Sequence, residues 1–371
     1  EKVKGFFRVH GKNRNYFDQG GCNFQNLQYT IFCKGLHMER GTPVNIYDIA
    51  KKSGVSIATV SRVLNNSPHV RAQTREKVLA VMQQESYAPN AFARGLGFGT
   101  MGMVGVLCTD VRDPFYAEAV GYVEERLRQQ GMHAILRCTG SALEDKQAAL
   151  EAMVRENVAA VILIGSAFRE DTDNRHIAAA AQRLPVIIIN GYVALPGVYC
   201  ITCDERRAVQ ELVESLFHRQ IRRILFLHDS MTYSSQQKIA GYRDGCAACG
   251  EPAQDDRIVQ VERRMDAVNA CIKRLLVQRV SFDAVIGSED ILAVAAQKSL
   301  QRIGINMPVI GFNNSILAQC CTPELSSVDN ALEDMCAAAL DTLGALLEHR
   351  AAQAHIVIPA RLVERDSFRI Q

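Results

Sequence analysis

The spacing of apolar residues changes near residue 101. Before that point, apolar side chains recur with the period of an amphipathic helix. They stand at Ile46, Ile49, Ala50, Val55, Val60, Val63 and Leu64, and then at Val78, Leu79 and Met82. This spacing predicts three short helices joined by short loops, which together make a small all-α domain over residues 44–89.

From residue 102 onward, short apolar runs alternate with longer amphipathic stretches, which is typical of βαβ units with a parallel sheet. The predicted strands are rich in β-branched residues and span Met103–Cys108, His133–Arg137, Ala159–Ile164, Val186–Ile189, Arg223–Leu227, Ala284–Ile286 and Val309–Gly311. An α/β segment covering 102–371 can close as one barrel or divide into two doubly wound lobes. Periodicity does not choose between the two.

Residues 1–37 follow neither the helical nor the strand period. The sequence begins at Glu1, and Met38 stands just before the first organised segment. We therefore expect residues 1–37 to be an unstructured or non-native leader.

Length and charge add two constraints. A chain of 371 residues favours two or three folding units. Apolar runs stay short of the roughly 18 to 20 residues that cross a bilayer, and no secretory pattern opens the chain, so we expect a cytoplasmic protein. Residues 38–100 carry 8 Lys and Arg against 4 Asp and Glu, whereas residues 101–371 carry 28 against 34. A polyanion such as DNA would dock on the positive segment.

Twelve cysteines invite a metal-binding interpretation. Two Cys-x-x-Cys pairs, Cys200 with Cys203 and Cys246 with Cys249, could supply the four thiolates of a zinc site. The first pair ends an expected strand, the second lies in an expected helix, and neither has the Gly-rich turn of a zinc knuckle. We therefore expect reduced thiols in apolar surroundings, with no metal, cofactor or disulfide.

The segment from Val44 to Asn65 has the mechanics of a helix-turn-helix. Gly54 can take the positive φ at which the first helix must stop, and Val55 can fill the turn. Ser56 is then placed as the N-cap of the second helix. The N-terminal end of that helix is the part that enters a DNA major groove.

The second helix divides its side chains between two faces. Val60, Val63 and Leu64 face inward, while the outward face carries Ile57, Ala58, Ser61 and Arg62. Arg62 suits a guanine edge, and Ile57 and Ala58 suit thymine methyl groups. Phosphate or sugar contacts are expected from Tyr47, Thr59, Ser61, Asn65 and His69. Three helices alone could also be a protein-interaction module.

A series of motifs runs through this segment without a gap: Asp48-Ile-Ala, Ser53-Gly-Val-Ser, Thr59-Val-Ser-Arg-Val-Leu-Asn, Thr74-Arg-Glu-Lys-Val, Tyr87-Ala-Pro-Asn-Ala and Ala93-Arg-Gly-Leu96. In this order they resemble the opening domain of the LacI/GalR family of bacterial repressors. The resemblance implies that residues 90–101 form a hinge that orders on operator DNA, with Leu96 as a minor-groove wedge. Ser56 and Ala93 complete the expected DNA-contacting set.

Two departures from the family pattern stand out. Gly95, Gly97 and Gly99 surround Leu96, and each glycine in a helix costs up to about 1 kcal/mol, so the hinge should be harder to order. Arg71 stands where a serine-like N-cap would begin the third helix, which should weaken the start of that helix by about 1 kcal/mol.

The resemblance continues to Phe368 through Asp113-Pro-Phe-Tyr116, Pro185-Val-Ile-Ile-Ile-Asn190, Ser288-Glu-Asp290 and Val309-Ile-Gly-Phe312. It implies an α/β sensor domain over 102–371, two-lobed like a periplasmic binding protein, with a ligand cleft where the carboxyl ends of two Rossmann-like sheets meet. Sugar sites combine polar groups with an aromatic wall. The expected effector-binding residues are Phe115, Tyr116, Asn190, Arg206 or Arg207, and Asp290. Glu289, Lys238 and Asn313-Asn314 depart from the family, so the ligand cannot be inherited from a relative.

We therefore expect a repressor of a carbohydrate-utilisation operon, which binds double-stranded operator DNA as a homodimer or tetramer. Its effector would be a sugar or sugar phosphate held between the lobes. The alternative is a cytosolic sugar- or nucleoside-binding protein without operator specificity. A transport-type binding protein would need a signal peptide, and the sequence has no P-loop, zinc-protease or nucleophile-elbow motif, so we expect no enzyme.

Overall fold

The computed structural model describes residues 46–64, 69–85 and 102–368. The expected leader, the hinge and the residues Asn65, Ala93 and Leu96 lie outside these ranges. The first two ranges form the three predicted helices, α1 (Ile46–Ser53), α2 (Ile57–Leu64) and α3 (Ala72–Gln84). Each helix buries one apolar side chain completely, namely Ile49, Val60 and Val78.

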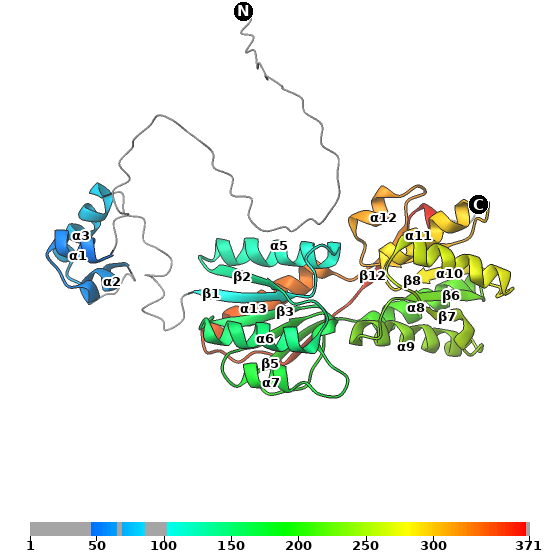
Figure 1. The fold of residues 1–371 in the computed structure, drawn as a ribbon, viewed down its shortest axis with the longest axis horizontal. Coiled ribbons are helices and arrows are strands. Elements are labelled where there is room, and N and C mark those ends of the chain that lie inside the picture. Colours follow the sequence, from blue (N-terminus) through cyan, green and yellow to red (C-terminus); the bar gives the residue numbers. More distant parts are fainter. Residues whose placement is uncertain (1–45, 65–68, 86–101, 369–371) are drawn as a thin grey trace, which may run out of the picture. The chain divides into compact units, whose positions relative to one another are not determined.

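The range from residue 102 forms two α/β lobes, each built on a six-stranded sheet (Figure 1). The first sheet has the order β11-β5-β4-β3-β1-β2, and all its neighbouring strands are parallel. Its strands are β1 (Met103–Cys108), β2 (His133–Cys138), β3 (Ala160–Ile164), β4 (Val186–Ile189), β5 (Val198–Cys203) and β11 (His355–Ile358).

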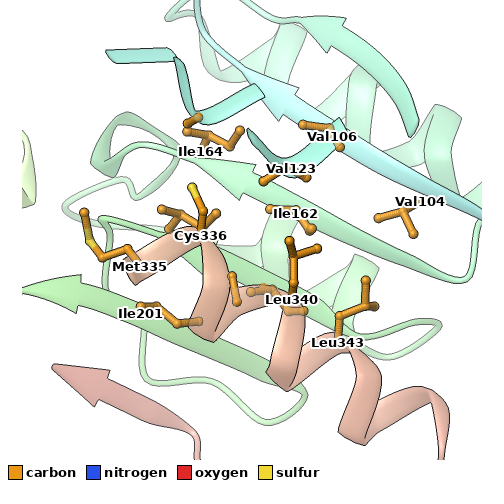
Figure 2. Packing of buried hydrophobic residues seen from close by; sticks show 14 of the residues in the cluster. Val104, Val106, Val123, Ile162, Ile164, Ile201, Met335, Cys336, Leu340 and Leu343 are labelled. Carbon is orange, nitrogen blue, oxygen red and sulfur yellow. The ribbon is translucent and has the colours of Figure 1, made fainter. Parts of the chain in front are cut away.

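Helices cover both faces of this first sheet. On one face lie α5 (Pro114–Gln129) and α13 (Leu332–Leu347), and their apolar side chains interlock with those of β1 and β3 (Figure 2). The other face packs on α6 (Leu143–Arg155) and α7 (Arg175–Ala181). Strands covered on both faces are apolar throughout, which is why the sequence revealed them as continuous apolar runs.

The second sheet has the order β12-β10-β9-β8-β6-β7, with only β12 antiparallel to its neighbour among the described strands. The strands are β6 (Ile224–His228), β7 (Ile258–Gln260), β8 (Ala284–Gly287), β9 (Val309–Phe312), β10 (Ser326–Asp329) and β12 (Arg361–Val363). One face packs on α8 (Glu205–His218) and α9 (Tyr233–Ala248), and the other on α10 (Met265–Val277), α11 (Asp290–Gln301) and α12 (Ile316–Cys320).

The chain passes between the lobes where β5 leads to α8, where β10 leads to α13, and where β11 leads to β12. Neither lobe is therefore one continuous segment. Two separate sheets with these connections exclude the barrel, so the choice that periodicity left open is resolved in favour of two doubly wound lobes.

All seven predicted strands are present, with ends that shift by one residue at most. Four further strands were not predicted, namely β7, β10, β11 and β12, whereas β5 is the strand expected to end at the pair of Cys200 and Cys203. Some of these carry weak strand patterns, because β7 has three residues and β10 reads Ser-Ser-Val-Asp. A search of the described ranges finds no helix that is both long and apolar enough to span a bilayer.

Candidate functional site: a DNA-reading helix and a cavity between two lobes

The turn between α1 and α2 has the predicted geometry. Gly54 adopts a φ of 67°, and the amide of Val55 donates to the carbonyl of Ala50 at 3.1 Å, which closes the end of α1. The Ser56 hydroxyl accepts from the amide of Thr59 at 3.2 Å. Ser56 is thus the N-cap of α2, as expected, and this cap fixes the direction in which α2 leaves the turn.

The faces of α2 are as predicted wherever its side chains are described, while the side chain of Leu64, which was expected to face inward, lies outside the described residues. Val60 and Val63 are buried, whereas Ala58 and Arg62 are exposed and the side chain of Ile57 is 42% exposed. Thr59 is half-buried and His69 is exposed. The side chains of Tyr47 and Ser61 lie outside the described residues. Exposed Ile57 and Ala58 in the first turn of this capped helix, with exposed Arg62 in its last turn, are side chains suited to contacting base edges.

The third helix lacks a side-chain cap, as expected. Arg71 is the N-cap residue of α3 and has extended backbone angles, but its side chain makes no capping hydrogen bond. The C-terminal end of α3 is joined to α1 by an ion pair of 2.5 Å between Glu85 and Lys52.

A cavity of about 750 Å³ lies at the carboxyl ends of both sheets. Residues after β1, β2, β3 and β4 line it from the first lobe, and residues after β6, β8 and β9 line it from the second. This is the place where parallel α/β sheets bind ligands, since loops from several strands converge there.

Two aromatic rings stand on the first-lobe side of this cavity. Phe115 and Tyr116 lie edge to face, with ring centroids 5.4 Å apart. Tyr116 packs on Gly165, where a Cβ would come within 2.6 Å of the tyrosine ring. Burial raises the pKa of Tyr116 to about 12, so its phenol stays neutral and can donate a hydrogen bond.

Asp290 lines the cavity from the second lobe, and its carboxylate is already engaged. It accepts hydrogen bonds from the amide and the hydroxyl of Ser315, both at 2.7 Å, and from the hydroxyl of Ser327 at 2.6 Å. Burial raises the pKa of Asp290 to about 6 despite these donors. The N-cap of α11 is Glu289, so Asp290 holds the cavity wall together rather than capping the helix.

A chain of polar and charged groups leads from the cavity wall into the interior. Asn190 has a φ of 57° and donates to Glu205 at 3.3 Å. Lys238 is 1% exposed and lies 3.5 Å from both Glu205 and Glu289, with its ammonium 4.0 Å from the centroid of the Phe312 ring. Burial alone would lower the pKa of Lys238, but the two carboxylates raise it, so the lysine stays charged.

Arg206 and Arg207 do not belong to the cavity lining. Both are exposed on α8, where Arg206 pairs with Asp244 at 2.5 Å and Arg207 pairs with Glu211 at 2.7 Å. The neighbouring residue Glu205 is the one that α8 turns inward. The structure thus brings together four of the six expected effector residues, Phe115, Tyr116, Asn190 and Asp290, and leaves the two arginines outside.

Arg263 was not predicted, yet it lines the cavity and bridges the two lobes. Its guanidinium pairs with Asp113 of the first lobe and, at 2.8 Å, with Asp229 of the second. Arg263 and Asp113 are 150 residues apart in sequence, so no local pattern could have joined them.

The two Cys-x-x-Cys pairs are placed apart. Cys200 packs under α6 and α7, and Cys203 packs on the opposite face of the same sheet. Cys246 and Cys249 belong to the second lobe, on and just after α9. Within the described ranges, no group of three His, Cys, Asp or Glu side chains is arranged to hold a metal ion.

A capped helix-turn-helix together with a two-lobed, aromatic-walled cavity defines a ligand-responsive DNA-binding regulator. Residues 45–90 match the family described as bacterial regulatory proteins of the lacI family. Residues 101–367 match the family described as periplasmic binding proteins and sugar binding domain of the LacI family. The chain therefore belongs to the LacI family of transcription regulators.

Curated relatives agree with this assignment. An HTH-type transcriptional regulator of Lachnoclostridium phytofermentans is 40% identical over 306 residues, which cover 81% of this chain and 92% of that protein. Catabolite control protein A of Priestia megaterium is 28% identical, and the match covers 87% of this chain and 99% of that protein. The first relative is a transcriptional regulator by name, and the second is a control protein by name.

The fold is shared with a solved repressor. The lac repressor dimer bound to operator and the anti-inducer ONPF superposes with a TM-score of 0.78 at 22% sequence identity. The match covers 88% of this chain and 99% of the repressor. The likeness extends to the complete two-lobed architecture.

Proposed function

We propose that this chain is a homodimeric operator-binding regulator whose effector is a neutral, polyhydroxylated molecule such as a sugar. It would act in the cytoplasm, where its DNA target lies. The observation that carries the effector class is the charge balance of the cavity, which has more carboxylates than cations.

The cavity lining holds the carboxylates Asp110, Asp113, Asp229, Glu289 and Asp290 against the guanidinium groups of Arg112 and Arg263. Both arginines are already paired, Arg112 with Asp110 and Arg263 with Asp113 and Asp229. A phosphate would therefore meet surplus negative charge in a partly desolvated space, which is unfavourable. Hydroxyl groups can donate to the same carboxylates, so a sugar is favoured over a sugar phosphate.

The remaining contacts to the ligand would come from aromatic side chains and from an amide. The Phe115 ring would cover the apolar face of the ligand, and the Tyr116 hydroxyl and Asn190 would hydrogen-bond its polar rim. Asp290 would act as a positioning residue, because Ser315 and Ser327 already occupy its oxygens. The ligand would bind two arrangements of the lobes with different affinities. Its binding would therefore favour one arrangement and change the affinity of the protein for the operator.

On DNA, paired copies of α2 would read two half-sites about one helical turn apart. Arg62 is proposed to donate to a guanine edge, with Ile57 and Ala58 on neighbouring thymine methyl groups. The sugar–phosphate backbone of the DNA would be contacted by Ser56, Thr59, Ser61, Tyr47, Asn65 and His69. The minor groove would be contacted by Ala93 and Leu96.

Selection from randomised duplex DNA at fixed salt tests the DNA-binding half of this proposal. The full chain should recover a near-palindrome, and Arg62→Ala should blur one guanine position, with a loss of about 1 to 3 kcal/mol at that base. Arg155→Ala is the matched control, since Arg155 is exposed on α6. Sequence-random DNA that dissociates at moderate salt would favour the alternative, a binding protein without operator specificity.

Thermal unfolding with paired ligands tests the effector class. A neutral hexose or disaccharide should raise the unfolding temperature, while the matching hexose 6-phosphate should not. Phe115→Ala should remove the shift, whereas Arg207→Ala should keep it, because Arg207 lies outside the cavity. Stabilisation by the phosphate ester alone would refute the charge argument.

A further inference from the structure

Two cysteines face each other at the edge of the first lobe. Cys108 is the last residue of β1 and Cys138 the last residue of β2, and they are direct partners in the parallel register. Their Sγ atoms lie 3.8 Å apart. Neighbouring strands lie about 4.8 Å apart, which is within the Cα separation of about 4.4 to 6.8 Å that disulfides span. Bonding therefore requires side-chain rotation and a small strand shift, not a different fold.

The two thiols differ in exposure. Cys138 is exposed, while Cys108 is buried under α5. β2 is the edge strand of its sheet and pairs with β1 alone among the described strands, so it can shift by a few tenths of an ångström at small cost. Burial, together with the neighbouring Cys138, raises the pKa of Cys108 to about 12. An oxidant would therefore meet Cys138 first.

We propose that Cys108 and Cys138 form a redox modification site, in which a peroxide converts the two thiols to a reversible disulfide. The Sγ atom of Cys138 attacks one peroxide oxygen, the O–O bond breaks, and Cys138 becomes a sulfenic acid as the first water leaves. The Sγ atom of Cys108 then displaces the sulfenic hydroxyl group, its proton leaves with that group as a second water, and the S–S bond forms. The two sulfurs give up two electrons, and hydrogen peroxide accepts both.

The site adjoins the effector cavity. Cys108 is followed by Thr109 and Asp110, and Ser141 lies three residues beyond Cys138. The cavity lining includes Thr109, Asp110 and Ser141. The two strand ends are joined by backbone hydrogen bonds from Thr139 to Cys108 and from Gly140 to Thr109, both of 2.9 Å. A disulfide would lock these ends together at the cavity rim. The proposed chemistry rests on the geometry of the thiols and does not depend on the proposed ligand.

Peptide mapping of the full chain under non-reducing conditions, before and after hydrogen peroxide, tests the site. The expected product is a peptide carrying Cys108 joined to one carrying Cys138, two hydrogen atoms lighter than the sum of the thiol forms and reversed by dithiothreitol. Cys138→Ser should abolish this product. Cys320→Ser is the matched control, because Cys320 is another exposed cysteine, and it should leave the product unchanged.

A second variant keeps the test independent of folding. In Cys108→Ser the sulfenic acid on Cys138 has no resolving thiol, so it should persist and be trapped by dimedone at Cys138. The proposal is overturned if wild-type Cys138 proceeds to sulfinic acid while Cys108 stays a thiol. It is equally overturned if peroxide oxidises Cys320 and leaves Cys138 and Cys108 unchanged.

Discussion

At the scale of the residue, the burial of Asp290 makes its contribution to stability depend on pH, because its pKa rises on folding to about 6. The folded state then holds the proton more tightly than the unfolded chain does. The stabilisation is present below the ordinary aspartate pKa of about 4 and is lost as the pH rises through about 6.

A comparison with Asp290→Asn isolates this contribution. The free energy of unfolding of the wild type, measured relative to that of Asp290→Asn, should fall by about 2 kcal/mol between about pH 4 and pH 7, since each pKa unit corresponds to about 1.36 kcal/mol and the unfolded aspartate is already partly ionised at pH 4. Urea unfolding at each pH measures it. Asp334→Asn on the exposed side of α13 should show no such trend. A flat or rising difference for Asp290→Asn would contradict the burial argument.

Lys238 is the second residue with a large expected effect. Its ammonium is the one cation within 4 Å of both Glu205 and Glu289 among the described ion pairs, so Lys238→Met leaves the buried Glu205 and the half-buried Glu289 without a counter-charge. The expected loss in the free energy of unfolding is about 3 to 5 kcal/mol. Lys273→Met, at an exposed position on α10, should cost little. The double variant Lys238→Met with Glu205→Gln should recover part of the loss; no recovery would mean that the charges are not coupled.

At the scale of elements, the N-terminus of α3 can be stabilised by a residue that caps it. Arg71 already has the extended backbone angles of an N-cap but makes no capping hydrogen bond, so Arg71→Ser should stabilise α3 by about 1 kcal/mol. Ser56→Ala should weaken α2 by a similar amount, because it removes the hydrogen bond from Thr59. Hydrogen exchange of the amides in the first turn of each helix measures both effects. Faster exchange in α3 of Arg71→Ser would show that its N-terminus is held in another way.

The sequence predicted elements best where local pattern and burial agree. The turn at Gly54 and Ser56, and buried strands such as β1 and β3, carry their signal within a few neighbouring residues. Edge strands such as β12 lack that signal because they are short and half-exposed. In the cavity, the sequence pointed to Arg206 where α8 turns Glu205 inward, since one step along a helix rotates the side chain by about 100°.

At the scale of the whole molecule, Arg263 is one of the contacts that join the two lobes, beside the hydrogen bond that Gln236 donates to Asp171. Arg263→Ala removes the cation between Asp113 and Asp229 and leaves two carboxylates near each other, so the cleft should open. Small-angle scattering should report a larger radius of gyration than for the wild type. Arg264→Ala is the neighbouring control, because Arg264 pairs with Glu262 and Asp266 within its own lobe. An unchanged radius in Arg263→Ala would mean that other contacts hold the lobes.

The passage of the chain back into the first lobe also has a consequence for protein synthesis. The core of that lobe includes Met335, Cys336, Leu340 and Leu343 of α13, and its sheet is completed only by β11 (Figure 2). A ribosome that has translated the first lobe up to β5 has therefore released a sheet with one face covered by α5 alone. The lobe encoded first cannot finish folding until the second lobe has been made, so the part of this face over β4 and β5, where α13 packs, is the surface that a chaperone would have to shield in the meantime.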